Sequence, residues 1–139
     1  MRIVQPRLMT EIDRLAQEEY GISGLLLMEN AGIKAFQEFL REWNESDRAV
    51  AGESGSEQRQ PASLLFIAGG GNNGGDALVM ARQAFIHGGF EVGVLLRGNK
   101  LNEQMQVHYR IVQSLGIPVT VWEDDPQAGL KLAYNVYYG

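Results

Sequence analysis

Short apolar runs alternate along the chain with segments of helical spacing. Residues 64–67, 91–96 and 118–122 are largely apolar over four to six positions, as expected of strands buried in a sheet. Residues 77–85 and 102–115 repeat apolar positions every three or four residues, which predicts helices. Strands and helices in this order predict β-α-β units and a parallel sheet with helices on both faces. The pattern therefore predicts a Rossmann-like, three-layer α/β domain.

Two helices are expected before the first strand. Thr10 followed by Asp13 resembles a capping box, which predicts a first helix running from there to about Tyr20. Ser23 is a suitable N-cap for a second helix, which the apolar spacing predicts over residues 24–43. Two N-terminal helices therefore precede the sheet.

Two further segments follow from composition. Residues 44–63 are polar and lack periodicity, which predicts a mobile loop. Residues 124–126 indicate a turn or a helix start, and residues 130–138 supply a fourth apolar run that we expect to form a strand. No repeat is evident, so we expect one domain over residues 1–139.

Composition narrows the class of function. The chain is 45% hydrophobic and 21% charged, with a net charge of -5, which is typical of a globular protein and argues against a general nucleic-acid or membrane-surface binder. Cysteine is absent, so disulfides and thiol chemistry are excluded. The N-terminal residues carry no apolar signal core, and no run approaches the roughly 20 residues of a membrane span. We expect a cytoplasmic protein.

The most informative stretch is the glycine-rich segment 69–76, which follows the first strand. Its five glycines allow close approach of a ligand and positive φ angles, and a helix N-terminus behind it favours a phosphate. Asn72 and Asn73 add amide groups for a polar ligand or a cation, or else serve the turn itself. Asp76 is either an N-cap or a ligand contact. The absence of Lys followed by Ser or Thr excludes a standard P-loop.

Other polar residues allow two interpretations each. Arg97 lies just past the second strand, where a residue that contacts the adenosine ribose or its 2′-phosphate is expected. Lys100 lies at the same edge, although a solvated lysine is the simpler interpretation. His87 and His108 lack an evident catalytic partner and fit surface positions. Glu29 is either exposed on an amphipathic helix or buried with a partner.

Three motifs in order carry a family resemblance. Residues 9–13 (MTEID), 27–32 (LMENAG) and 69–76 (GGGNNGGD) resemble the YjeF N-terminal domain family, the NAD(P)H-hydrate epimerases. The resemblance covers nearly the whole chain and implies a Rossmann-like fold. It implies an isomerase that interconverts the R and S forms of hydrated NADH and NADPH in nicotinamide cofactor repair.

The resemblance also implies a set of site residues and partners. Asn72, Asn73, Gly74, Gly75 and Asp76 would bind the hydrate, and Asn73 would contact a potassium ion. An ADP- or ATP-dependent NAD(P)H-hydrate dehydratase would act as partner or fused domain. A homodimer is expected if the N-terminal helices present an apolar face.

The chain departs from the family at its C-terminal end. The family has an acidic residue on the fourth strand, and Asn135 occupies the corresponding position here, where it could offer an oxygen to the cation. The sequence stops where the family continues with a second glycine loop and further strands, so the domain is expected to lack its last elements. Two alternatives follow: a non-catalytic nucleotide-binding or scaffold module of the same fold, and an NADP-dependent dehydrogenase, for which the chain lacks a substrate domain.

Overall fold

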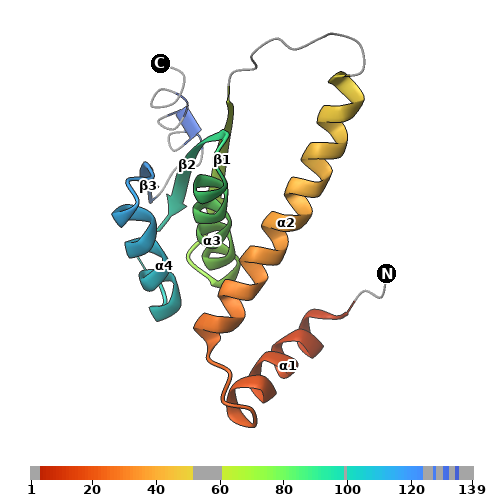
Figure 1. Ribbon diagram of the computed structural model, residues 1–139. Helices are drawn as coiled ribbons and strands as arrows, with labels where there is room; N and C mark the ends of the chain where they lie inside the picture. Colours follow the sequence, from red (N-terminus) through yellow and green to blue (C-terminus); the bar gives the residue numbers. More distant parts are fainter. Residues whose placement is uncertain are drawn as a thin grey trace.

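A computed structural model describes residues 4–51, 61–98 and 100–123 and the single positions 127, 130, 131 and 134. Its elements, in chain order, are α1 (Pro6–Glu18), α2 (Gly24–Ala51), β1 (Ala62–Ala68), α3 (Asn72–His87), β2 (Phe90–Arg97), α4 (Glu103–Ser114) and β3 (Val119–Trp122). The three strands form a parallel sheet in the order β1-β2-β3 (Figure 1). This arrangement confirms the α/β prediction, with strand and helix bounds that differ from the expected ones by a few residues.

The sheet buries one face against the helices. Strand register pairs Ala68 with Leu96, and Leu96 with Val121, so even-numbered positions of β1 and β2 share a face. That face contacts α3 and joins Met105 and Val112 of α4 in a single apolar core. On the other face, Leu65 and Ile67 of β1 are exposed, whereas Leu95 of β2 is 1% exposed. The expectation of helices on both faces is confirmed for the first face and stays a prediction for the second.

The structure contradicts the predicted start of α1 and confirms the predicted N-cap of α2. The first helix begins at Pro6, not at Thr10, because proline is favoured in the first turn, and the Thr10 hydroxyl instead donates to the Pro6 carbonyl (3.1 Å). The prediction for Ser23 is confirmed, since its Oγ accepts from the Leu26 amide (3.2 Å). The proline, and not the apparent capping box at Thr10, therefore marks where the first helix begins.

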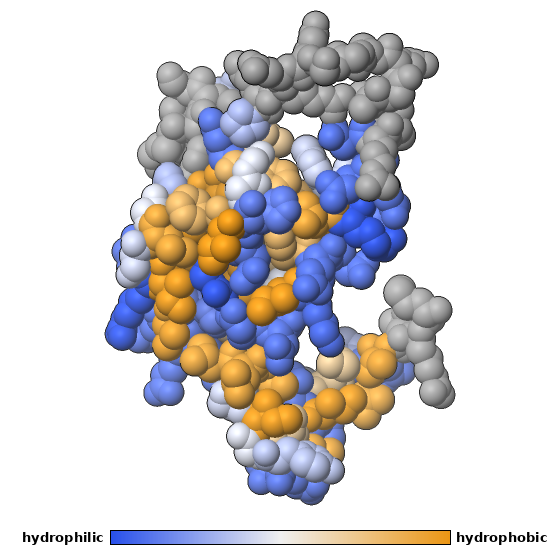
Figure 2. Space-filling view, in the orientation of Figure 1, coloured by the Kyte–Doolittle hydropathy of each residue, from blue (hydrophilic) through white to orange (hydrophobic). Residues whose placement is uncertain are grey.

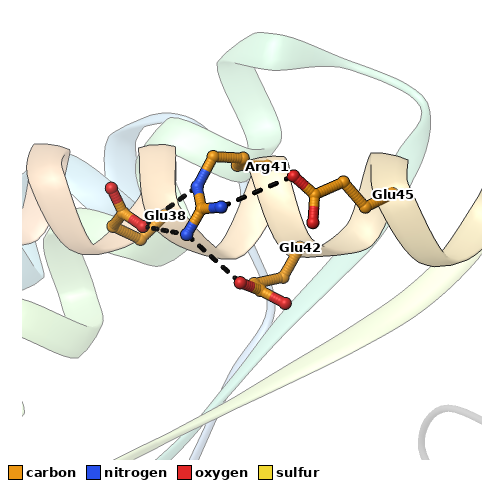
Figure 3. Close-up of polar contacts among 4 residues, drawn as sticks. All are labelled: Glu38, Arg41, Glu42 and Glu45. Atoms are coloured by element: carbon orange, nitrogen blue, oxygen red, sulfur yellow. Dashed lines mark hydrogen bonds and ion pairs between the residues drawn. The ribbon is translucent and has the colours of Figure 1, made fainter.

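Helix α2 is longer than its apolar pattern suggested. It continues to Ala51, eight residues beyond the expected end, so the loop predicted for residues 44–63 is wrong over residues 44–51, and also over residues 62–63, which belong to β1. Figure 3 shows the reason for part of this extension: the Arg41 guanidinium donates to Glu38 (2.8 Å), Glu42 (3.2 Å) and Glu45 (3.4 Å). Pairs at three- and four-residue spacing stabilise a helix without any apolar face. Residues 52–60 lie outside the described residues.

Helices α2 and α3 approach each other closely through glycine. A Cβ atom added to Gly32 of α2 would lie 2.4 Å from Cβ of Val79 in α3, and one added to Gly75 of α3 would lie 2.2 Å from Sδ of Met28 in α2. Such separations are well below van der Waals contact, so neither position has room for a side chain. The two glycines therefore fix how near the second helix lies to the beginning of the third.

Helix α1 has an unusual surface. None of its residues is buried, and Leu8, Met9 and Ile12 are 44–53% exposed. Figure 1 shows α1 diverging from the body of the protein, and Figure 2 shows apolar side chains gathered along it. No helix among the described residues is long and apolar enough to cross a membrane. An apolar stripe on α1 is thus left facing solvent.

The predicted fourth strand is not seen where the structure describes it. Leu130, Lys131 and Tyr134 are helical, which contradicts a strand at these three positions of the 130–138 run. Asn135, predicted from the resemblance as a metal ligand, lies outside the described residues.

Candidate functional site

A cavity of about 360 Å³ opens at the carboxyl end of β1, where the chain turns into α3. Residues of the glycine-rich turn line it, together with one apolar residue near the end of the strand. The lining residues are Ile67, Gly69, Gly71, Asn72, Asn73 and Gly74. Ligands of open parallel sheets bind outside the carboxyl ends of the strands, so the cavity lies where the sequence predicted the site.

The turn places a helix N-terminus at the cavity wall. Helix α3 begins at Asn72, with Gly71 as an N-cap residue that has no side-chain hydrogen bond. The Gly74 and Gly75 amides both donate to the Gly71 carbonyl (3.0 and 3.3 Å). The first amides of a helix have no partner within it and carry partial positive charge, so those of Asn72 and Asn73 are available to a ligand. The N-terminus of α3 can therefore receive an anion.

The glycines serve a different purpose from the one expected. Positive φ angles occur at Gly21, Gly88, Gly89, Gly98 and Gly116, and none occurs in the turn. Instead, a Cβ atom on Gly74 would lie 1.9 Å from the Gly69 carbonyl oxygen. The turn needs glycine there because its backbone folds back on itself, not because of a left-handed conformation.

The predicted site residues do not all reach the cavity. Asn72, Asn73 and Gly74 line it, whereas Gly75 packs on Met28. Asp76 is the fifth residue of α3 and not its N-cap, so the capping interpretation of Asp76 is wrong. Its binding role stays a prediction.

Asp76 nevertheless has an unusual environment. Partial burial raises the pKa of its carboxyl group above the ordinary value, and the nearby negative charge of Asp13 in α1 raises it further. The charged form of Asp76 is therefore less favourable in the folded protein than in the unfolded chain. A carboxylate held under these conditions is typical of functional positions, although structural reasons produce the same shift.

The loop after β2 converges on the turn, as predicted. A Cβ atom on Gly70 would lie 3.1 Å from the Lys100 carbonyl oxygen and 3.9 Å from that of Arg97. Asn102 caps α4 by accepting from the Met105 amide (2.9 Å), and its side-chain amide also donates to Oδ1 of Asn72 (3.0 Å). The sequence predicted Asn102 as a cap but gave no sign of its contact with the turn. The end near residue 139, expected at the same edge, lies outside the described residues.

A partly buried ion pair joins α2 and α3. Glu29 of α2 makes an ion pair with Arg82 of α3, with side chains 28% and 16% exposed respectively. The sequence left open whether Glu29 was exposed or buried with a partner; it is partly buried, and Arg82 is that partner. Its carboxylate also lies 3.9 Å from Nδ1 of His108 in α4.

The two histidines occupy opposite environments. His87 is exposed at the end of α3, as expected, and its Nδ1 lies 2.9 Å from the Gly88 carbonyl oxygen. The surface position expected for His108 is wrong: this side chain is 3% exposed, and neither ring nitrogen has a hydrogen-bond partner within the described residues. Burial lowers the pKa of His108; the Glu29 carboxylate opposes this and the Arg82 charge adds to it. His108 is therefore neutral near pH 7.

The fold and the turn define a Rossmann-like domain with a helix N-terminus at the wall of a cavity. The family described as YjeF-related protein N-terminus matches residues 24–135, and the chain belongs to this family. The match extends over the second helix, the glycine turn and the whole described sheet.

Individual relatives agree with the family match. The chain is 33% identical over 118 residues to a bifunctional NAD(P)H-hydrate repair enzyme Nnr of Moorella thermoacetica, covering 84% of this chain and 20% of that one. It is 31% identical over 128 residues to an NAD(P)H-hydrate epimerase of Rhodopirellula baltica, covering 91% and 46%. A crystal structure of the yeast protein ynu0 superposes with a TM-score of 0.70 at 27% identity, covering 87% and 47%. The chain thus spans half or less of the length of these proteins.

The Glu29–Arg82 pair is expected to stabilise the junction of α2 and α3. Glu29→Gln leaves the Arg82 guanidinium partly buried without its counter-charge, so we expect a loss of about 2 kcal/mol in the free energy of unfolding. Glu38→Gln makes the same change at the exposed Arg41 network and is expected to cost less than about 0.5 kcal/mol. Urea denaturation of both variants measures the difference. Equal losses would show that the buried pair contributes no more than a surface pair.

His108 is expected to make the stability depend on pH. Because its pKa is lowered on folding, the unfolded chain binds more protons, and stability falls as the pH drops from about 6.5 through the folded pKa. His108→Gln removes this group, so the change in free energy of unfolding between pH 7 and pH 5 should become smaller. His87→Gln, at an exposed histidine, is the control and should keep the wild-type pH dependence. An unchanged slope in His108→Gln contradicts the assignment.

Proposed function

We propose that this chain carries the substrate site of an NAD(P)H-hydrate epimerase, which interconverts the R and S hydrates of NADH and NADPH. The observation that carries the proposal is the cavity at the glycine turn, where the α3 N-terminus and two asparagine amides meet beneath an apolar strand end. A pyrophosphate suits the free amides, and the asparagines suit a polar ring substituent. The names of relatives such as the Rhodopirellula baltica epimerase support the same activity.

The reaction places limited demands on the protein. Departure of the ring hydroxyl leaves a cation stabilised by the ring nitrogen, and return of water to the other face completes the inversion. Both steps require a group that gives or accepts a proton near the ring. Asn73 lines the cavity and would orient the hydroxyl or the water, while Asp76, which is not among the lining residues, is the acid of the 69–76 segment.

A potassium ion is part of the same proposal. Hard cations prefer carbonyl and amide oxygens, and the side chain of Asn73 at the cavity offers one. Among the described residues, no group of three or more histidines, aspartates or glutamates could hold a metal ion. Bound at Asn73, the potassium ion would supply positive charge near the substrate oxygen.

The proposal is tested by following the R hydrate of NADPH on a chiral column, with and without potassium chloride. We expect the wild-type chain to accelerate appearance of the S hydrate and potassium to increase the rate. Asn73→Ala should lower kcat/KM about tenfold or more, because a contact to a charged group contributes about 1.5–3 kcal/mol. Asn30→Ala, at an exposed asparagine of α2, is the matched control and should behave as the wild type.

Two results would contradict the proposal. Failure of the folded wild-type chain to accelerate the reaction, with hydrate binding still detected by calorimetry, would favour a non-catalytic binding module of the same fold. Turnover that is unaffected in Asn73→Ala would exclude the asparagine from the site.

We further propose that the partner enzyme is a dehydratase that consumes one hydrate epimer. An epimerase is useful only if a second, stereospecific enzyme removes one of the two forms. Relatives named bifunctional repair enzymes, of which this chain spans about one fifth, are consistent with two such activities in one polypeptide.

We propose that two copies of the chain associate through the exposed stripe of α1. Leu8, Met9 and Ile12 form this stripe, and Figure 2 shows apolar side chains gathered along the helix. Leu26 of α2 is also 55% exposed. Contiguous apolar surface of this kind indicates an interface, and a second copy supplies the matching stripe by two-fold symmetry.

The dimer is tested by light scattering during gel filtration at tens of micromolar protein. The wild type is expected to elute as a dimer, and Ile12→Glu as a monomer, because a charge in the stripe would lose its hydration on association. Ile86→Glu, at a 61% exposed residue of α3, should remain dimeric. A monomeric wild type would contradict the proposal.

A further inference from the structure

An arginine and a tryptophan form a platform at the carboxyl edge of the sheet. The Arg97 guanidinium lies 5.5 Å from the centre of the Trp122 ring, within the range of a cation–π interaction. Strand register pairs these residues across β2 and β3, so their side chains project from the same face. Trp122 thus holds a charged group at the end of β2, and Arg97 stays exposed.

The platform faces the cavity side of the sheet. Ile67 lines the cavity, and register pairs it with Leu95, two residues before Arg97 and on the same face. The backbone at Arg97 abuts the turn, since a Cβ atom on Gly70 would lie 3.9 Å from the Arg97 carbonyl oxygen. Lys100, which is exposed, adds a second positive charge to this edge. A ligand that extends from the cavity across the end of β2 therefore meets Arg97.

The strand order suggests what such a ligand carries there. When a dinucleotide places its pyrophosphate on the glycine turn after β1, its adenosine ribose lies by the end of the neighbouring strand. An acid at that point binds the 2′-hydroxyl, and an arginine binds a 2′-phosphate. Here the position holds arginine, and no described carboxylate forms an ion pair with it. A guanidinium held over an aromatic ring keeps its N–H groups available for bidentate contact with phosphate.

We propose that Arg97, held by Trp122, determines specificity by binding the 2′-phosphate of the adenosine ribose, so that the site favours NADPH hydrate over NADH hydrate. The proposal rests on the proposed function, since it assigns the adenosine half of that substrate. If the proposal is right, a 2′-phosphate raises the affinity of a ligand through its contact with Arg97, and not through the overall positive charge of this edge.

Binding of two small probes tests the inference without turnover. Calorimetry compares adenosine 2′,5′-bisphosphate with adenosine 5′-monophosphate on the wild-type chain and on Arg97→Gln. We expect the bisphosphate to bind at least about 10-fold more tightly to the wild type, in line with charge-assisted hydrogen bonds, and the two probes to bind equally to Arg97→Gln. Arg110→Gln removes the same charge from an exposed position on α4 and should keep the wild-type preference.

A spectroscopic measurement locates the probe. Trp43 and Trp122 are the two tryptophans of the chain, so Trp43→Phe leaves Trp122 as the single indole fluorophore. The bisphosphate should change this emission in the Trp43→Phe chain, and the change should disappear when Arg97→Gln is added. An emission change that persists in the double variant would overturn the assignment.

Turnover of the two hydrates separates this inference from the proposed function. A wild-type chain that epimerises both hydrates with equal kcat/KM, or that binds both probes equally, overturns the role of Arg97 and leaves the epimerase intact. A chain that epimerises neither hydrate but still prefers the bisphosphate through Arg97 overturns the epimerase and supports the 2′-phosphate site.

Discussion

The close packing of α2 on the start of α3 is the constraint on which the site depends. Gly32 lies against Val79 and Gly75 against Met28, with no room for a Cβ atom at either glycine, and the Glu29–Arg82 ion pair joins the same two helices. These contacts fix where the first turn of α3 lies, and the amides of that turn form one wall of the cavity. A shift of α2 would therefore move the N-terminus of α3 at the cavity, although α2 contributes no residue to the cavity lining.

The turn itself combines two uses of glycine. Gly74 lets the backbone pass within contact distance of the Gly69 carbonyl, and Gly71 begins the helix without a side-chain cap. A capping side chain would occupy an amide that the cavity leaves available. An uncapped helix start is less stable than a capped one, but it leaves amides available to a ligand. Asp76 carries a similar cost in stability, because its partial burial disfavours the charged form.

Much of the candidate site could be predicted from local sequence. The order of strand, glycine turn and helix located the cavity, and three motifs pointed to the family before any contact was known. The role of Asn102 beside Asn72 and the burial of His108 could not be predicted, because each depends on where α4 packs against α3. The end of α2 was misjudged because ion pairs around Arg41 stabilise a helix that lacks apolar periodicity.

The sequence by itself determined the alternation of strands and helices and the position of the glycine turn, since periodicity and turn chemistry are encoded within a few neighbouring residues. Only the tertiary structure decided that the glycines serve close contact and not positive φ, that Glu29 pairs with a residue 53 positions away, and that Arg97 rests on Trp122. Contacts of this kind join segments distant in the chain, and their geometry is set by how the helices pack and by which face of the sheet each side chain takes.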